Sequence, residues 1–275
     1  MARNSACGAR SLPPWRCPAP GPCDAEGERR VPLLSPDPAA FPVEPPGDLT
    51  DHKGIAAHDQ SAFDALDEMV DHWSRPGWSD GARAYYWMLA FRDVPELKEL
   101  AQQCQEALSP LRLDPVPTEW LHVTLVRVGA PGSVDTAQLR GLADRARALL
   151  PETFTVRATP LAGSRGAVRL TLTPWEPLIS LHAALVAANA SAGLPAKKPT
   201  TAFRPHLSLA YNNRPRPAGP VIETVAGLRS LPSVELSVAD VQLVELRRCG
   251  AEYRWDVLES LPLTLSELAD HRPRA

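Results

Sequence analysis

The chain has 275 residues, 44% of them hydrophobic and 22% charged, which is typical of a soluble globular protein with one large domain or two small ones. Its net charge of −3 argues against a protein that holds long nucleic acid through many phosphate contacts, because such binding requires a basic surface. No apolar run approaches the roughly 20 residues of a membrane span, and no signal-peptide pattern opens the chain. The five cysteines are scattered, and the acidic residues form no metal-like cluster. We therefore expect a cytoplasmic protein with no membrane contact, no metal and no other cofactor.

The first 80 residues differ in composition from the rest of the chain. Residues 1–50 contain 11 of the 30 prolines and little apolar periodicity. Such a segment cannot bury enough apolar surface to offset its ordering entropy, so we predict a disordered N-terminal arm. Residues 51–80 are expected to form a helical extension, because apolar residues recur at helical spacing over 59–73. The segment 266–275 is expected to be a tail.

From residue 81 to residue 265, the apolar pattern alternates between strands and helices. It predicts strands near 84–91, 120–128, 153–159, 167–173, 203–211, 235–247 and 252–259. It predicts helices that begin at Pro95 and near 139, 177 and 220. The order of elements in the first half resembles the order in the second. The sequence therefore predicts an α+β fold with two pseudo-symmetric lobes, each an antiparallel sheet backed by helices, around a central groove.

One short pattern occurs in both halves, as Leu-His-Val-Thr-Leu at 121–125 and Pro-His-Leu-Ser-Leu at 205–209. Side chains alternate between the faces of a strand, so His122 and Thr124 face one way and the apolar neighbours face the core. His206 and Ser208 obey the same parity. A single histidine in such a strand is more often structural, but two copies with matched hydroxyls favour a catalytic site.

Two imidazoles that face each other across a groove suit acid–base catalysis. The unperturbed imidazole has a pKa of about 6.5, so near neutral pH one ring can accept a proton while the other donates one. A hydroxyl two residues along the strand lies about 6.5–7 Å away on the same face. From there it can donate to a phosphoryl oxygen and stabilise charge in the transition state. The pattern therefore suits in-line attack on a phosphodiester.

Both motifs resemble the signatures of the two-histidine (2H) phosphoesterase superfamily, which includes the bacterial 2′-5′ RNA ligase and cyclic phosphodiesterase families. The predicted order of strands and helices from 84 to 259 is similar to that superfamily's bilobed fold. The resemblance implies that His122 and His206 are the acid–base pair, and that Thr124 and Ser208 bind the phosphate.

The resemblance also implies a hydrolase for RNA processing that opens a 2′,3′-cyclic phosphate without a metal. Its partner would be an RNA end or a cyclic nucleotide, and we expect a monomer. One alternative is 2′-5′ RNA ligation by the same chemistry. The other is a module that binds a nucleotide or an RNA end without turnover.

Residues beside the motifs are candidates for substrate binding. Arg204 shares the parity of His206, and Tyr86 lies in an aromatic run that can stack on a base. Tyr211 follows the second motif where many relatives carry a basic residue, which leaves the cationic partner of the phosphate open.

Arg127 has the opposite parity from His122 and is predicted to be structural. Lys197 and Lys198 are expected to lie in a solvated loop. The sequence assigns no role to His72 or His182.

Overall fold

The computed structural model describes residues 31–264, and within them the strands form two antiparallel sheets and a short ladder. The first sheet has the order β11-β10-β2-β4, built from Glu252–Pro262, Asp240–Cys249, Arg83–Ala90 and His122–Gly129. The second sheet has the order β3-β7-β6-β5-β9, built from Asp114–Pro115, His206–Tyr211, Ala167–Thr173, Phe154–Ser164 and Val234–Val238. The ladder pairs β1 (Glu68–Met69) with β8 (Arg216–Pro217).

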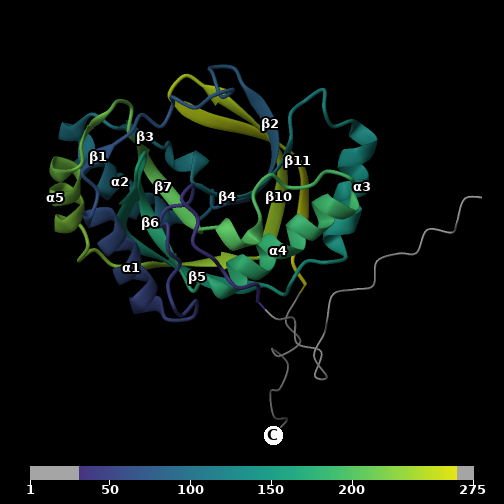
Figure 1. The fold of residues 1–275 in the computed structure, drawn as a ribbon, viewed down its shortest axis with the longest axis horizontal. Helices are drawn as coiled ribbons and strands as arrows, with labels where there is room; N and C mark the ends of the chain where they lie inside the picture. The colour runs from purple at the N-terminus through teal and green to yellow at the C-terminus, as the bar shows by residue number, and fades with distance from the viewer. Residues whose placement is uncertain (1–30, 265–275) are drawn as a thin grey trace, which may run out of the picture. The chain divides into compact units, whose positions relative to one another are not determined.

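Helices cover the two sheets on opposite sides of the molecule (Figure 1). They are α1 (His52–Asp64), α2 (Pro95–Leu108), α3 (Thr136–Arg147), α4 (Glu176–Ser191) and α5 (Gly219–Gly227), with 3₁₀ turns at Ser109–Leu111, Thr118–Trp120 and Thr200–Ala202. Helices α1, α2 and α5 contact the second sheet, whereas α3 and α4 contact the first. The prediction of an α+β fold with two lobes of antiparallel sheet is confirmed.

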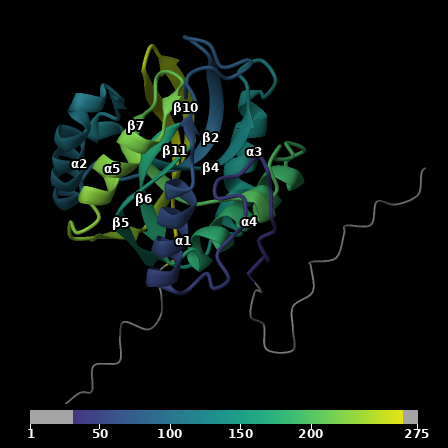
Figure 2. The ribbon, with the colours of Figure 1, turned by 60° about the vertical axis from the view of Figure 1, so that its left-hand side comes forward.

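The lobes are not the two halves of the chain. Helix α2 follows a strand of the first sheet but packs on the second, and α4 follows a strand of the second sheet but lies against β4 of the first (Figures 1 and 2). The strand predicted over 235–247 is two strands, because β9 pairs with β5 while β10 pairs with β2. The chain thus passes from one sheet to the other at Ala239, a change that an unbroken apolar pattern does not reveal.

The predicted helix over 59–73 is wrong beyond Asp64. Helix α1 begins earlier, at His52, because the Asp51 side chain caps it by accepting from the Lys53 N–H at 3.0 Å. After Asp64 the chain leaves the helix, and β1 pairs with β8 from residues about 150 positions away in the sequence. Val70, one of the apolar residues at helical spacing, is 51% exposed. Tertiary pairing overrides the local pattern there.

Residues 31–50 pack on the second lobe, so the prediction of disorder over 1–50 is wrong for this part. Prolines have no backbone N–H to donate to carbonyl oxygens nearby. In this segment the Arg204 side chain donates to carbonyl oxygens instead. Its guanidinium donates to the carbonyl oxygens of Pro42 at 3.0 Å, Ser35 at 2.8 Å and Val43 at 3.0 Å. We call residues 31–50 the docked arm. The rest of the predicted arm, 1–30, and the predicted tail, 266–275, lie outside the described residues.

None of the helices in residues 31–264 has the length and apolarity needed to cross a bilayer.

Replacing Arg204 with methionine tests how the docked arm is held. Arg204→Met fills the same space but leaves the arm carbonyls without donors, so we expect the free energy of unfolding to fall by about 2–4 kcal/mol. Urea denaturation measures this change. Arg214→Met is the matched control, since Arg214 is exposed and, among the residues that the structure describes, its side chain donates only a 3.4 Å bond to the neighbouring Asn213. It should change stability by less than about 0.5 kcal/mol. Equal stabilities of the two variants would show that Arg204 does not hold the arm.

Candidate active site

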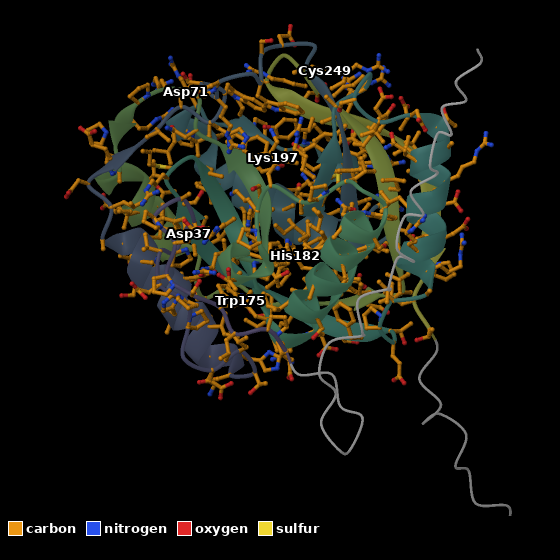
Figure 3. All side chains as sticks on the ribbon, turned by 45° about the vertical axis from the view of Figure 1, so that its right-hand side comes forward. Asp37, Asp71, Trp175, His182, Lys197 and Cys249 are labelled. Carbon is orange, nitrogen blue, oxygen red and sulfur yellow. The ribbon has the colours of Figure 1, made fainter. Side chains whose placement is uncertain are left out.

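A cavity of about 730 Å³ lies between the two lobes, and both histidine motifs line it. Strands β4 and β7 approach each other from different sheets, so His122 and Thr124 line one side while His206 and Ser208 line the other. The prediction that the two motifs share one cavity is confirmed. Lys197 and His182 lie toward the centre of the view in Figure 3, whereas Cys249 and Asp71 lie at its edge; of these four, only Lys197 and His182 line the cavity.

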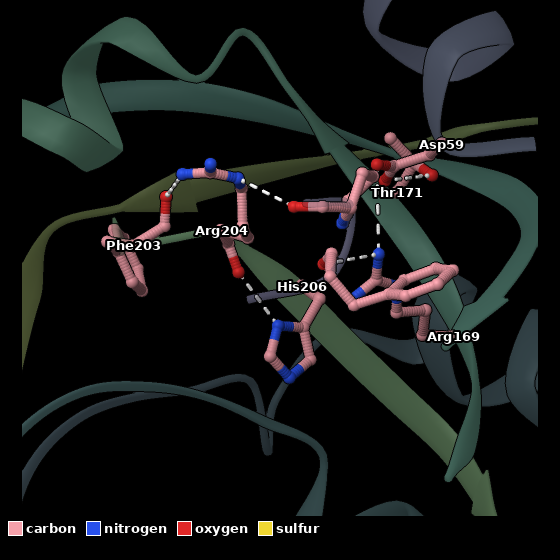
Figure 4. A network of polar contacts seen from close by, with 8 residues as sticks. Asp59, Arg169, Thr171, Phe203, Arg204 and His206 are labelled. Carbon is pink, nitrogen blue, oxygen red and sulfur yellow. Dashed lines mark hydrogen bonds and ion pairs between the residues drawn. The ribbon is translucent and has the colours of Figure 1, made fainter. Parts of the chain in front are cut away.

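Both motif histidines are held by the same hydrogen bond. Nδ1 of His122 lies 2.7 Å from the Trp120 carbonyl oxygen, and Nδ1 of His206 lies 2.8 Å from the Arg204 carbonyl oxygen. A carbonyl oxygen only accepts, so in each ring the Nδ1–H donates. Nε2 of each ring therefore remains for the cavity, as an acceptor when the ring is neutral and as a donor when it is protonated. Figure 4 shows this bond for His206.

The two motif hydroxyls differ in their surroundings. Thr124 is partly exposed to the cavity, and no hydrogen-bond partner for its hydroxyl lies among residues 31–264. Ser208 is 9% exposed, and its hydroxyl shares a hydrogen bond with the hydroxyl of Tyr211. A ligand oxygen would therefore meet a free hydroxyl on β4 and a hydroxyl already joined to a tyrosine on β7.

A β-bulge brings Arg127 into the cavity. In the pairing of β2 with β4, Met88 is opposite Thr124 while Trp87 is opposite Val126, so Leu125 is an extra residue on β4. The extra residue reverses the parity of Val126 and Arg127, before a second register shift at Val128. Arg127 consequently lines the cavity on the same side as Thr124, so its predicted parity, which assumed strict alternation, is wrong.

Arg169 is a second cation that the sequence did not single out. In β6 it lies opposite Ser208, and it is 2% exposed at the cavity wall. Its guanidinium is 3.7 Å from the buried carboxylate of Asp59 on α1, which also accepts a 2.9 Å hydrogen bond from Thr171 (Figure 4). Burial raises the pKa of the Asp59 carboxyl, and the neighbouring Arg169 opposes that shift. Helix α1 thus supplies the group that holds a cation beside the second motif.

Cationic side chains line the cavity, and no Asp or Glu does among the described residues. The cations are Arg75, Arg127, Arg169, Lys197, Lys198 and Arg204. Two of them, Arg169 and Arg204, are buried and already bonded to protein groups. The other four form no ion pair with any residue in 31–264. The net charge of −3 conceals this local excess, which favours an anionic ligand.

The three predicted substrate-binding residues have different outcomes. Arg204 reaches the cavity wall, but its guanidinium is used by the docked arm, so its assignment as a substrate-binding side chain is wrong. Tyr86 lines the cavity and hydrogen-bonds to Arg127. Tyr211 is 3% exposed and stacks on His72, with the ring centroids 3.9 Å apart. Both tyrosines are therefore placed at the site.

Burial lowers the pKa of both motif histidines, but their electrostatic surroundings differ. For His206, the neighbouring Arg169 adds to burial, and the pKa is lowered to about 3. For His122, burial lowers the pKa and the hydrogen bond to the Trp120 carbonyl partly restores it, with no cation contributing. Protonation is therefore opposed by a nearby positive charge at His206 only.

The cavity also contains residues that sequence reasoning passed over, His72, Arg75 and Tyr253. His72 and Arg75 come from the irregular segment after β1, and Tyr253 comes from β11. No local pattern marks them, because long-range packing alone brings them to the motifs. As potential metal ligands the lining offers only imidazoles, and in residues 31–264 no three His, Cys, Asp or Glu side chains are grouped to hold a metal ion.

Comparison with known proteins places this site in a family. A family model described as the 2′-5′ RNA ligase superfamily matches residues 89–249, more than half of the chain. The chain belongs to the 2′-5′ RNA ligase superfamily. The predicted resemblance is thereby confirmed, and the matched range contains both histidine motifs. No curated protein sequence matches the chain.

Solved structures of the superfamily share the fold. E. coli LigT complexed with NADP+ is similar with a TM-score of 0.51 and 19% identity, over 66% of this chain and 99% of LigT. E. coli LigT complexed with 3′-AMP is similar with a TM-score of 0.50 and 19% identity, over 67% of this chain and 99% of LigT. At this identity the similarity shows a common two-lobed fold. Both the docked arm and α1 precede the range that the 2′-5′ RNA ligase superfamily model matches.

The buried histidines predict loss of stability in mild acid. His182 on α4 has its pKa lowered by burial from 6.5 to about 4. Between these values the unfolded chain binds more protons than the folded one, so the free energy of unfolding falls as the pH falls, by at most about 3 kcal/mol from this group. His182→Asn keeps a hydrogen-bonding atom near Thr200, which lies 3.0 Å from Nδ1, but cannot titrate. Urea denaturation at several pH values should show a shallower pH dependence in this variant; an unchanged dependence would contradict the assignment.

Proposed function

We propose that this protein hydrolyses a 2′,3′-cyclic phosphate, at an RNA end or on a nucleotide, by acid–base catalysis between His122 and His206. One observation carries the proposal. Two imidazoles with the same fixed tautomer line one cavity with both motif hydroxyls, among cations and with no carboxylate from residues 31–264. Such a cavity attracts a phosphodiester and provides both a base and an acid beside it.

The surroundings of the two histidines favour one assignment of roles. His206 is the better base, because Arg169 disfavours its protonation and leaves Nε2 with a free lone pair. His122 is the better acid, because no cation opposes its protonation and the negative charge of a bound phosphodiester favours it.

The reaction then follows from these roles. Nε2 of His206 accepts a proton from water while the water oxygen forms its bond to phosphorus. As the bond from phosphorus to the ribose oxygen breaks, Nε2–H of His122 donates its proton to that oxygen. Thr124 and Ser208 donate to the non-bridging oxygens, where charge increases in the transition state. The product is a phosphate monoester, and no oxidant, reductant or second substrate is required.

The cations at the cavity wall have a place in this scheme. Arg75 acts electrostatically on both His206 and Tyr211, so its positive charge lies near the second motif. It is exposed and is one of the cations without an ion pair in the described chain. We assign Arg75 as the cation that holds the phosphate, the partner that the sequence after the second motif left open.

The nucleotide complexes of LigT support a nucleotide or RNA end as the substrate. E. coli LigT has been solved complexed with 3′-AMP and with NADP+. The cavity of about 730 Å³ falls within the usual range for small-molecule sites, and the aromatic rings of Trp78 and Tyr86 line it. These rings offer faces on which a base can stack. We therefore place the base on this side of the cavity.

Replacing each histidine tests the proposed chemistry. In a panel of 2′,3′- and 1″,2″-cyclic phosphates with EDTA present, wild type should open at least one substrate. His122→Ala and His206→Ala should each lower kcat by about 10²–10⁴-fold, because general acid–base groups contribute factors of this size. His52→Ala, on the exposed first residue of α1, is the control and should match wild type. Near-wild-type turnover in either motif variant would refute the paired-histidine mechanism. RNA joining without hydrolysis would favour 2′-5′ ligation instead.

Replacing Thr124 tests phosphate binding by the motif hydroxyls. Thr124→Val preserves the shape and the strand preference but removes the donor. Losing a hydrogen bond to a charged group costs about 1.5–3 kcal/mol, so kcat/KM should fall by roughly tenfold to a hundredfold. Thr155→Val makes the same change at an exposed position of β5 and should leave kcat/KM unchanged. Identical kinetics in the two variants would show that the Thr124 hydroxyl does not meet the substrate.

A further inference from the structure

His72, Arg75 and Tyr253 form a hydrogen-bonded chain at the cavity wall. Nη2 of Arg75 lies 3.2 Å from Nδ1 of His72, and Nε2 of His72 lies 2.8 Å from the hydroxyl oxygen of Tyr253. The His72 ring stacks on Tyr211 and is 7% exposed, so its position is fixed. His72, Arg75 and Tyr253 all lie outside residues 89–249, the range that the superfamily model matches.

The chemistry of His72, Arg75 and Tyr253 determines which atom donates and which accepts in each of their hydrogen bonds. A guanidinium only donates, so Nδ1 of His72 accepts from Arg75 and carries no proton. A neutral imidazole has one N–H, which must then be on Nε2, and it donates to the Tyr253 oxygen. Burial keeps the ring neutral, since it lowers the pKa of His72 to about 2, and the charge of Arg75 lowers it further.

This assignment decides where the Tyr253 proton points. The oxygen of Tyr253 accepts from His72, and the Trp78 indole, which can only donate, hydrogen-bonds to the same oxygen. The hydroxyl proton therefore needs an acceptor elsewhere, and none lies among residues 31–264. Tyr253 is 8% exposed, and it lines the cavity with its ring centroid 6.4 Å from that of His122. Its unpartnered O–H is thus available to a ligand in the cavity.

We propose that Tyr253 donates a hydrogen bond to a phosphate oxygen of the substrate, and that His72 and Arg75 are positioning residues that direct this hydroxyl. The proposal rests on the proposed function for the presence of a phosphodiester in the cavity. Burial raises the pKa of the Tyr253 phenol, so the hydroxyl keeps its proton at neutral pH. Tyr253 would then supply a third hydroxyl beside Thr124 and Ser208, from the first lobe.

Tyr253→Phe is the direct test, because it keeps the ring and removes only the hydroxyl. We expect kcat/KM on the best cyclic phosphate to fall by about tenfold to a hundredfold, and the Kd for inorganic phosphate to rise by about tenfold. Calorimetry measures the phosphate Kd without turnover. Tyr85→Phe removes a phenol that does not line the cavity and should match wild type. If packing of the ring were its whole role, Tyr253→Phe would match wild type too.

A paired set of variants protects the test against misfolding. Tyr253→Phe leaves the buried N–H of His72 without its acceptor, whereas combining it with His72→Phe removes both partners and keeps a ring on Tyr211. The double variant should fold and show the same loss of phosphate affinity as Tyr253→Phe.

His72→Gln retains a donor close to the position of Nε2 and should keep phosphate affinity within about threefold of wild type. His72→Leu removes that donor and should weaken phosphate binding by about threefold to tenfold, with the hydroxyl no longer directed.

The outcomes separate this proposal from the proposed function. Wild type that binds phosphate but opens no cyclic phosphate would overturn the function, while the phosphate affinity of Tyr253→Phe would still decide the role of Tyr253. Wild-type turnover with unchanged phosphate affinity and kcat/KM in Tyr253→Phe and in the double variant would overturn the Tyr253 proposal alone. Wild type that binds no phosphate would overturn both.

Discussion

The site depends on one hydrogen bond that occurs once in each lobe, from the Nδ1–H of a strand histidine to the carbonyl oxygen two residues before it. The acceptors belong to Trp120 for His122 and to Arg204 for His206, at 2.7 and 2.8 Å. Each bond fixes the tautomer, and therefore leaves Nε2 of each ring to the cavity. Because β4 and β7 belong to different sheets, the two rings approach each other only when the lobes pack as observed. The meeting of the two imidazoles in one cavity is thus a consequence of how the lobes are assembled.

Gathering cations around buried imidazoles has an electrostatic cost, and the chain offsets it with residues from outside the superfamily range. Asp59 of α1 lies against Arg169, and carbonyl oxygens of the docked arm accept from Arg204. Arg204 has two structural roles. Its backbone carbonyl oxygen accepts from His206, and its guanidinium donates to carbonyl oxygens of the docked arm. The docked arm and α1 therefore do more than extend the domain, because they satisfy the buried charges of Arg204 and Arg169 at the cavity wall.

Local patterns in the sequence predicted what local physics controls. Alternating apolar residues identified both histidine strands, and helical spacing identified α2, α3 and α4. The parity argument placed His122 and Thr124 correctly but failed at Arg127, because a single extra residue in β4 reverses the faces after it. The proline-rich composition of the docked arm predicted disorder because little apolar surface can be buried there, and only the three-dimensional structure shows Arg204 donating to its carbonyl oxygens. Tyr253 had no local signal, since a long-range contact with a histidine 181 residues earlier holds it at the cavity wall.

The most direct measurement is the fate of water in the reaction. Adenosine 2′,3′-cyclic phosphate, or the most reactive substrate of the cyclic-phosphate panel, would be incubated with the protein in ¹⁸O-labelled water containing EDTA, and the product followed by ³¹P NMR. If His206 activates water against phosphorus while His122 protonates the departing ribose oxygen, the product is a single nucleoside monophosphate with one ¹⁸O on phosphorus. A cyclic phosphate that persists unchanged across the panel, or a product whose phosphorus carries no ¹⁸O, would contradict the account.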